Sequence, residues 1–213
     1  MNLLPLLNDT SNRGTHPLYG VVVGIVTNNQ DPDNLGRVKV RFPWLSDENE
    51  SAWARMATPM AGNKRGLYVL PEVDDEVLVV FEQGDLRYPF VLGALWNAKD
   101  VPPTTNSDGK NNIRLMQSRS GHLIRLNDED GKETIEIIDK TGKNKLVIDT
   151  ARDAIAITSN KDITLSAPQG TIKLEAKTFE FKSSGSAKLE AGAGLDIKAS
   201  ATMNLKGATI NLN

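Results

Sequence analysis

The sequence predicts an all-β protein with two parts, a small barrel followed by a stack of short strands. Three observations support this fold class. Between residues 18 and 97, segments rich in β-branched residues alternate with turn formers. From Leu146 onward, an apolar pair recurs at a mean spacing of 8 residues. All three Trp lie before residue 100, as expected for a globular first part and a repetitive second part.

The repeat in residues 146–213 is a pair of apolar residues with one residue between them, followed by a short connector. Successive side chains of a strand point to opposite faces, so each pair shares one face. A unit this short cannot bury its own apolar face, and the units are therefore expected to stack as a β-helix or β-prism. The pairs are Leu146/Ile148, Ile155/Ile157, Ile163/Leu165, Ile172/Leu174, Phe179/Phe181, Ala187/Leu189, Leu195/Ile197, Met203/Leu205 and Ile210/Leu212.

The connectors and the outward positions agree with stacked strands. Turn formers separate the units, for example at 167–170 and 183–186. A disordered tail is the alternative, but disorder gives no reason to keep an apolar pair every eight residues. Outward charges of both signs indicate a solvated face, on which cross-chain ion pairs would contribute about 0 to 1 kcal/mol each. These charges are Lys173, Glu175, Lys177, Glu180, Lys182, Lys188 and Glu190.

Composition limits the functional classes. The net charge is −2, so no global basic character indicates binding to nucleic acid or to an anionic membrane. The chain has no Cys, which excludes disulfides, cysteine ligands and cysteine nucleophiles. Residues 1–7 are apolar but too short for a membrane span, and they lack the basic start and cleavage site of a signal peptide. Synthesis in the cytoplasm is therefore predicted.

Residues 1–17 are expected to form an N-terminal arm. Its apolar residues are either a contact for a neighbouring protein or part of a frayed terminus. The residues assigned to a partner interface are Leu3, Leu4, Leu6 and Leu7.

Residues 18–97 are expected to form a compact barrel domain. Within one segment, Val38, Val40 and Phe42 face inward and the three basic residues beside them face outward. Six short strands in about 80 residues favour a small Greek-key barrel of the OB type. The expected strands are 19–26, 37–42, 52–56, 66–70, 76–82 and 89–96, with a hairpin turn at 84–87.

Residues 98–112 are rich in Pro, Ser, Asn and Gly and are expected to form a linker. Beyond the linker, residues 113–213 are assigned to one continuous β-structure. Its first strands are longer than the repeat units and are joined by turns at 128–131 and 140–142. These longer strands are 113–118, 120–126, 133–139 and 145–149.

Two clusters near the start of the barrel are candidate sites. Asp31, Asp33 and Asn34 supply neighbouring oxygen atoms, but a calcium loop needs more ligands and a bidentate Glu. A turn stabilised by Asp and Pro is the preferred interpretation, and no metal is expected. The second cluster is a basic edge on an OB-like barrel, where nucleic acid binding would also require exposed aromatic residues for stacking. It comprises Arg37, Lys39 and Arg41, with Trp44 and Trp53 assigned to core or subunit packing.

No catalytic residue and no cofactor are predicted. His122 follows Gly121 at the start of a strand and has no neighbouring acid in the sequence. The carboxylate pairs Asp74/Asp75 and Glu129/Asp130 lie in turns, and nothing there indicates a raised pKa or a substrate between two carboxyl groups.

Several stretches resemble the OB domain of contractile-tail spike proteins. The longest is residues 22–45 (VVGIVTNNQDPDNLGRVKVRFPWL), followed by residues 71–82 and 89–93. Residues 118–126 resemble the start of that family's β-helix. The family includes phage baseplate assembly protein V, VgrG proteins of type VI secretion and the spikes of phage-like injection particles.

The resemblance implies a homotrimer, in which three chains wind into one β-helix needle below a collar of three OB domains. It implies a structural spike of a contractile injection machine, assembled into the baseplate of a phage tail or tail-like particle. Such a spike punctures the target envelope and links a hub to a tip. Two alternatives stay open: an OB-fold nucleic-acid-binding protein with an oligomerising tail, and a trimeric tailspike that binds polysaccharide.

The sequence departs from the family pattern at several positions. Asp75 stands where the family usually has Gly, and Asp tolerates a left-handed backbone better than most residues. About 17 residues precede the OB segment, so a separate hub protein is expected. The two His, His16 and His122, are far from the C-terminus, so no iron is expected at the tip. A PAAR-type tip protein is expected to cap a platform formed by Ile210, Asn211, Leu212 and Asn213.

Overall fold

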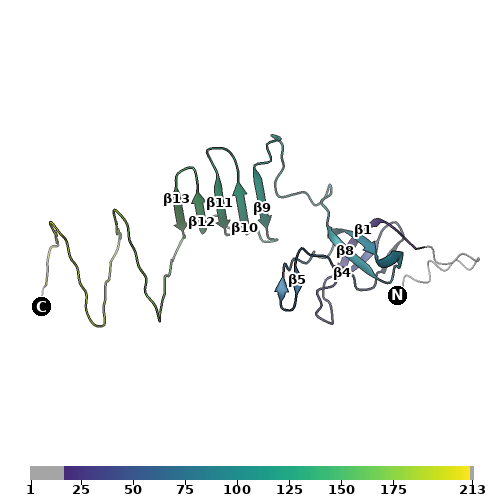
Figure 1. Cartoon of the computed structure of the whole chain (residues 1–213), viewed down its shortest axis with the longest axis horizontal. Helices are drawn as coiled ribbons and strands as arrows, with labels where there is room; N and C mark the ends of the chain where they lie inside the picture. Colours follow the sequence, from purple (N-terminus) through teal and green to yellow (C-terminus); the bar gives the residue numbers. More distant parts are fainter. Residues whose placement is uncertain (1–16, 212–213) are drawn as a thin grey trace, which may run out of the picture. The chain divides into compact units, whose positions relative to one another are not determined.

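The computed structural model describes residues 17–211 of the chain (Figure 1). Within these residues all regular structure is β, apart from one 3-10 turn at Glu82–Gly84. No helix of the described part is long and apolar enough to cross a membrane. The chain divides into two compact units after Asn160.

The first sheet has six strands in the order β3-β2-β1-β7-β8-β4. β1 pairs antiparallel with β2 and β7, β7 pairs antiparallel with β8, and β4 pairs parallel with β8. Irregular register in the β1–β2 and β7–β8 pairs bends the sheet, which curls into the half-barrel expected of an OB-like domain. The strands are Val21–Asn28 (β1), Lys39–Phe42 (β2), Ser46–Glu50 (β3), Arg55–Met56 (β4), Glu76–Phe81 (β7) and Pro89–Ala94 (β8).

The core lies on the inner face of this curled sheet and follows the predicted alternation. Phe42 is 1% exposed, and its ring centroid lies 5.6 Å from that of Phe81. A Cβ atom added to Gly24 of β1 would lie 3.2 Å from the Phe42 ring, so the glycine allows this ring to pack against the strand. The buried apolar residues are Val26, Val38, Val40, Phe42, Ala54, Val77, Val79, Phe81 and Val91.

Two expected strands of this domain were placed wrongly. The strand expected at 52–56 is reduced to Arg55–Met56, and Ser46–Glu50 forms a strand that the sequence did not predict. Ser46–Glu50 is polar, and it is a strand because it pairs with β2. Residues 67–70 form no strand; instead Ala61–Gly62 (β5) pairs with Arg65–Gly66 (β6) in a short hairpin.

The turn at 71–75 required one further correction. The left-handed residue is Asp74, with φ of 76°, and not Asp75. The Asp75 carboxylate instead accepts a hydrogen bond from the Glu72 backbone N–H at 2.8 Å. The Asp74 N–H donates to the Val26 carbonyl at 2.8 Å, which fixes the turn against β1. The left-handed backbone conformation that the family resemblance placed at Asp75 is therefore adopted by Asp74.

The second sheet is a five-stranded antiparallel meander in the order β13-β12-β11-β10-β9. Its strands agree with the expected segments to within a few residues. They are Ile113–Gln117 (β9), Leu123–Asn127 (β10), Thr134–Ile138 (β11), Lys145–Asp149 (β12) and Ala154–Thr158 (β13).

Residues 161–211 form no hydrogen-bonded strand within this chain. Figure 1 shows them as extended runs that reverse direction at the connectors. Their apolar pairs are exposed, for example Ile163 at 56% and Leu165 at 67%. The sequence predicted strands with one buried face here. A strand needs a partner for its backbone groups, and within the described residues of a single chain these units have none.

Candidate interaction surfaces

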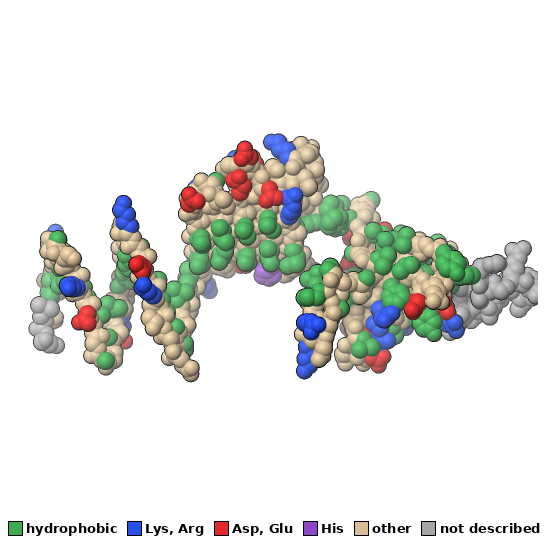
Figure 2. All heavy atoms as spheres, in the orientation of Figure 1, with side chains coloured by type: hydrophobic (Ala, Val, Ile, Leu, Met, Phe, Trp, Pro, Cys, Tyr) green, Lys and Arg blue, Asp and Glu red, His purple; other side chains and the backbone are tan. Residues whose placement is uncertain are grey.

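The β9–β13 sheet presents one apolar face with no covering layer among the residues described with it. Because the strands are in register, the apolar side chains form two rows across the sheet (Figure 2). The side chains are exposed at levels such as 52% for Ile137 and 71% for Ile155. One row is Leu126, Ile135, Ile148 and Ile155, and the other is Met116, Ile124, Ile137, Leu146 and Ile157.

The opposite face of this sheet is different in chemistry. Arg125 and Glu136 lie directly opposite each other on β10 and β11 and form an ion pair. Arg114, at the start of β9, lies on the same face as Leu126 and pairs with Asp128. Apart from this cation, the face with the two rows is apolar, whereas the opposite face combines the Arg125–Glu136 pair with apolar residues such as Leu123 and Ile138. A sheet with one such apolar face usually buries that face. An exposed apolar patch of this size marks an interaction surface.

A second apolar surface surrounds the β5–β6 hairpin, here called the arm (residues 58–70). The arm is closed by the Leu67 N–H, which donates to the Met60 carbonyl at 3.0 Å, and by the Thr58 hydroxyl, which donates to the Leu67 carbonyl at 2.8 Å. Gly66 is required there because an added Cβ would lie 2.6 Å from the Met60 oxygen. Tyr68 at the base of the arm is 76% exposed.

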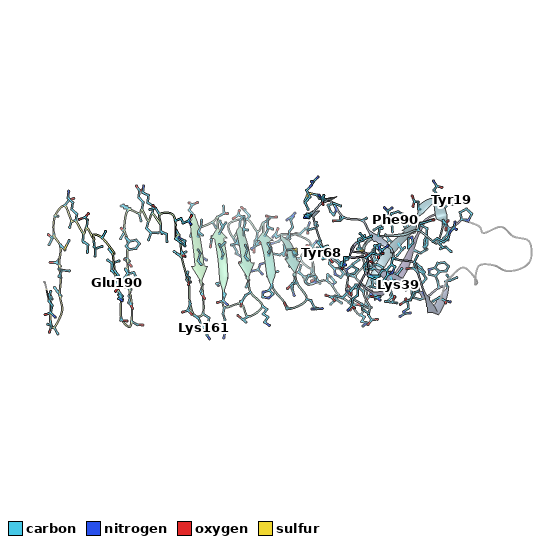
Figure 3. The ribbon with its side chains drawn as sticks, turned by 90° about the horizontal axis from the view of Figure 1, so that it is seen from below. Tyr19, Lys39, Tyr68, Phe90, Lys161 and Glu190 are labelled. Carbon is cyan, nitrogen blue, oxygen red and sulfur yellow. The ribbon has the colours of Figure 1, made fainter. Side chains whose placement is uncertain are left out.

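A groove of about 1750 Å³ lies between the arm and the curled sheet. Trp53, Arg55 and Phe90 line it on the sheet side, and the Arg55 guanidinium lies 4.4 Å from the centre of the Phe90 ring. Met60 and Tyr68 line it on the arm side (Figure 3 labels Tyr68 and Phe90). The groove is mostly apolar, and its lining contains side chains of both charges, such as Arg65 and Glu82, which suits a protein contact.

The curled sheet and the arm belong to a domain with recognisable relatives. The family described as the type VI secretion system/phage-baseplate injector OB domain matches residues 22–96. Residues 22–96, here called the injector OB domain, are similar to this family. The resemblance stated from the sequence is therefore confirmed for these residues.

Three curated relatives extend the similarity beyond the injector OB domain. The spike protein VgrG3 of Vibrio cholerae is 34% identical over 127 residues, which covers 56% of this chain and 12% of the relative. The actin cross-linking toxin VgrG1 of Vibrio cholerae is 32% identical over 127 residues, again 56% and 12%. VgrG1a of Pseudomonas aeruginosa is 31% identical over 145 residues, which covers 62% and 22%. The chain thus spans about a fifth or less of the length of these relatives.

The acidic loop of the injector OB domain is held by an ion pair. Arg37 donates to both carboxylate oxygens of Asp31, at 2.9 and 2.6 Å, and to Asp33 at 2.5 Å. The backbone N–H groups of Asp33, Leu35 and Arg37 also donate to Asp31. The Arg37 guanidinium holds the pKa of the Asp31 carboxyl well below its usual range. The predicted turn is confirmed, and no group of metal-binding residues is found in the described part of the chain.

Replacing Asp31 by Asn is expected to lower the thermal midpoint of the injector OB domain near neutral pH. The pKa of folded Asp31 is depressed, so its contribution is present above the unfolded value of 3.8 and is lost as pH falls through the folded value. The difference between wild type and variant should shrink as pH falls below about 4. Differential scanning calorimetry at several pH values measures it. Asp33→Asn, which loses one exposed contact, is the control and should show a smaller effect.

The predicted basic edge is largely neutralised by acidic partners. Arg37 is paired with Asp31, and Lys39 pairs with Glu50 at 2.9 Å, which lowers the pKa of the Glu50 carboxyl. Both cations also lie over the Trp53 ring, at 5.8 and 5.5 Å from its centre. Arg41, the third cation of this edge, also has an interaction partner. Because these cations already contact carboxylates and the Trp53 ring, fewer unpaired charges and aromatic faces are available to bind a nucleic acid strand.

The remaining predicted residues have structural surroundings. Trp44 is 51% exposed and its ring packs at 6.1 Å from the Phe42 ring. The His122 N–H donates to the Ser118 hydroxyl at 3.0 Å, and His122 Nδ1 accepts from the Lys140 N–H at 3.3 Å, so this residue links two turns. Glu129 pairs with Lys132 at 2.7 Å.

The predicted partner interfaces lie mainly outside the described residues. Leu3, Leu4, Leu6 and Leu7 of the N-terminal arm, and His16, are outside that range. At the other end, Ile210 is 50% exposed and Asn211 is exposed, whereas Leu212 and Asn213 are outside the range.

The hairpin arm was missed by sequence reasoning. The sequence at its base is the apolar run Leu67–Leu70 between Gly66 and Pro71. This run has the composition of a buried strand, and a strand was therefore expected there in place of the arm.

Proposed function

We propose that this chain is the structural central spike of a contractile injection machine, acting as a homotrimer that punctures a target envelope. The observation that carries the proposal is the uncovered apolar face of the β9–β13 sheet, followed by exposed apolar pairs that recur about every eight residues. Three copies arranged with these faces inward would bury them in one shared core. The injector OB domain and the relatives with spike names support this assignment.

The proposed mechanism is mechanical. Contraction of the tail drives a narrow needle whose stiffness comes from continuous strand pairing and a dry core of Ile, Leu and Val. Interleaved chains unfold slowly, because one chain cannot leave without breaking the contacts of its neighbours. The needle therefore transmits force and needs no chemical step, and enzymatic work is assigned to its partners.

Two partners follow from this role. A hub protein of the baseplate holds the OB end, where Leu3, Leu4, Leu6 and Leu7 of the N-terminal arm supply an apolar contact. A PAAR-type tip protein covers the last repeat unit, where a stack of strands presents unpaired backbone groups. The platform for the tip is formed by Ile210, Asn211, Leu212 and Asn213.

Light scattering on the purified chain tests the proposal. The chain mass is 23.2 kDa, so a trimer has three times this mass, about 70 kDa. We expect that mass, and an added mass when the tip protein of the same particle is mixed in. Deleting residues 204–213 should remove the added mass and leave the trimer. A monomer would refute the spike assignment, and a tip protein that still binds the deleted chain would refute the platform.

A further inference from the structure

The groove between the arm (residues 58–70) and the curled sheet leaves apolar side chains exposed. Met60 is 55% exposed and Val69 is 65% exposed, and both line the groove together with Tyr68. Trp53 and Phe90 complete its apolar lining on the sheet side. A continuous apolar surface of this kind on one small domain marks a contact site. The groove therefore suits an apolar occupant, and no segment within residues 17–211 fills it.

The chain enters the injector OB domain beside this groove. The Leu18 N–H donates to the Gly84 carbonyl at 3.0 Å, which holds the start of the described chain against the 3-10 turn. Gly84 has a φ of 79°, and a Cβ added to it would lie 2.6 Å from Pro17 Cβ, so only glycine permits this close approach. Glu82 and Arg87, on either side of Gly84 in the sequence, both line the groove. Pro17 thus lies close to the groove lining.

The sequence before Pro17 has two parts of different chemistry. Residues 1–7 (MNLLPLL) carry four Leu and no charged side chain, whereas residues 8–16 (NDTSNRGTH) are mostly polar. Leu7 is ten residues before Pro17. Ten residues span up to about 33 Å when extended. The polar residues are therefore long enough to act as a tether that lets the leucines reach the groove from Pro17.

The tether favours these leucines over an occupant from solution. A segment joined to its site by a short linker has an effective concentration of about 1 mM. At that concentration, a contact with a Kd of about 0.1 mM as a free peptide would be occupied about 90% of the time. A second copy or another protein must bind from solution, at its own lower concentration. In the purified chain, the attached apolar segment is therefore the favoured occupant.

We propose that the leucines of the N-terminal arm occupy the groove of their own chain. The residues are Leu3, Leu4, Leu6 and Leu7. In the proposed spike the same leucines contact the hub protein, so the hub must compete with the groove for them. The N-terminal arm is then held on its own domain until the hub takes it. The release step rests on the proposed function, whereas the docking itself does not.

Hydrogen exchange followed by mass spectrometry tests the docking in the full-length chain. The variant replaces all four leucines by Ser, and none of them belongs to the core of the curled sheet. We expect the backbone N–H groups of residues 58–70 to exchange about tenfold faster in the variant, because a cover that is present about 90% of the time is lost. The core strand β7 is the internal reference and should exchange at the same rate in both chains.

The matched control changes the tether and keeps the leucines. It replaces Asn8, Thr10, Ser11 and Asn12 by Ala, and residues 58–70 should then exchange as in the wild type. Equal exchange of residues 58–70 in the wild type and the Ser variant would overturn the docking.

Chemical cross-linking identifies the chain whose groove is filled, because the natural chain contains no Cys. Leu6→Cys with Tyr68→Cys, treated with a flexible bis-maleimide, should give a link within single chains on a denaturing gel. Leu6→Cys with Trp44→Cys is the control, because Trp44 is 51% exposed in the same domain but does not line the groove, and it should link much less.

The pattern of links separates the possible occupants. Equal linking to positions 44 and 68 would indicate an undocked segment and overturn the proposal. Links between copies would overturn docking within one chain. Light scattering on the same samples examines the proposed function separately: monomers with the link from 6 to 68 would refute the homotrimer and support the docking.

Discussion

Replacing Ile155 and Ile157 by Lys is expected to convert the proposed homotrimer into free chains of 23.2 kDa. In the single chain these side chains are 71% and 61% exposed, so the substitution removes little from the fold of the isolated sheet. In the proposed trimer they line the shared core. Burying one Ile stabilises by about 1.5 to 3 kcal/mol, so six such residues contribute on the order of 10 kcal/mol, and buried Lys adds a desolvation cost.

The matched control changes the same strand on its other face. Ala154 and Ala156 flank and separate the two Ile on β13 and are also exposed, so Ala154→Lys with Ala156→Lys adds the same charge on the outward side. Light scattering should give a trimer for this control and a monomer for the Ile variant. A trimer from both variants would show that the apolar face is not the interface.

Truncating Phe42 to Ala is expected to destabilise the injector OB domain by about 3 to 5 kcal/mol. Phe42 is 1% exposed and packs against Phe81 and the backbone of Gly24, so its loss leaves a cavity in the centre of the curled sheet. That amount is a large part of the 5 to 15 kcal/mol typical of a domain. Urea unfolding followed by Trp fluorescence isolates this domain, because all three Trp lie within residues 18–97.

Tyr68→Ala is the control for the Phe42 substitution. Tyr68 is an aromatic residue of the same domain but is 76% exposed, so its truncation should change the free energy of unfolding by about 0.5 kcal/mol or less. Equal destabilisation by the two variants would contradict the location of the core. A loss of trimer in the Tyr68 variant, with unfolding unchanged, would instead assign the arm to a subunit contact.

The strands that the sequence predicted well carry their own local pattern. Residues 37–42 alternate apolar and polar residues, and the structure buries Val38, Val40 and Phe42 as expected; residues 76–82 are a run of apolar residues between two Glu. Ser46–Glu50 has no such pattern, and it forms a strand through its pairing with β2. The run Leu67–Leu70 has the composition of a strand but lies at the base of the arm, because apolar composition alone does not supply a backbone partner.

The sequence by itself determined the all-β class, the resemblance of residues 22–96 to the injector OB family and the inward face of residues 37–42, because these follow from local alternation and from a long specific motif. The tertiary structure decided which residues meet. It placed Arg37 on Asp31, moved the left-handed turn residue to Asp74 and aligned the apolar pairs of β9–β13 into two uncovered rows. Such contacts depend on register and on strand order, and neither property is encoded within a single strand.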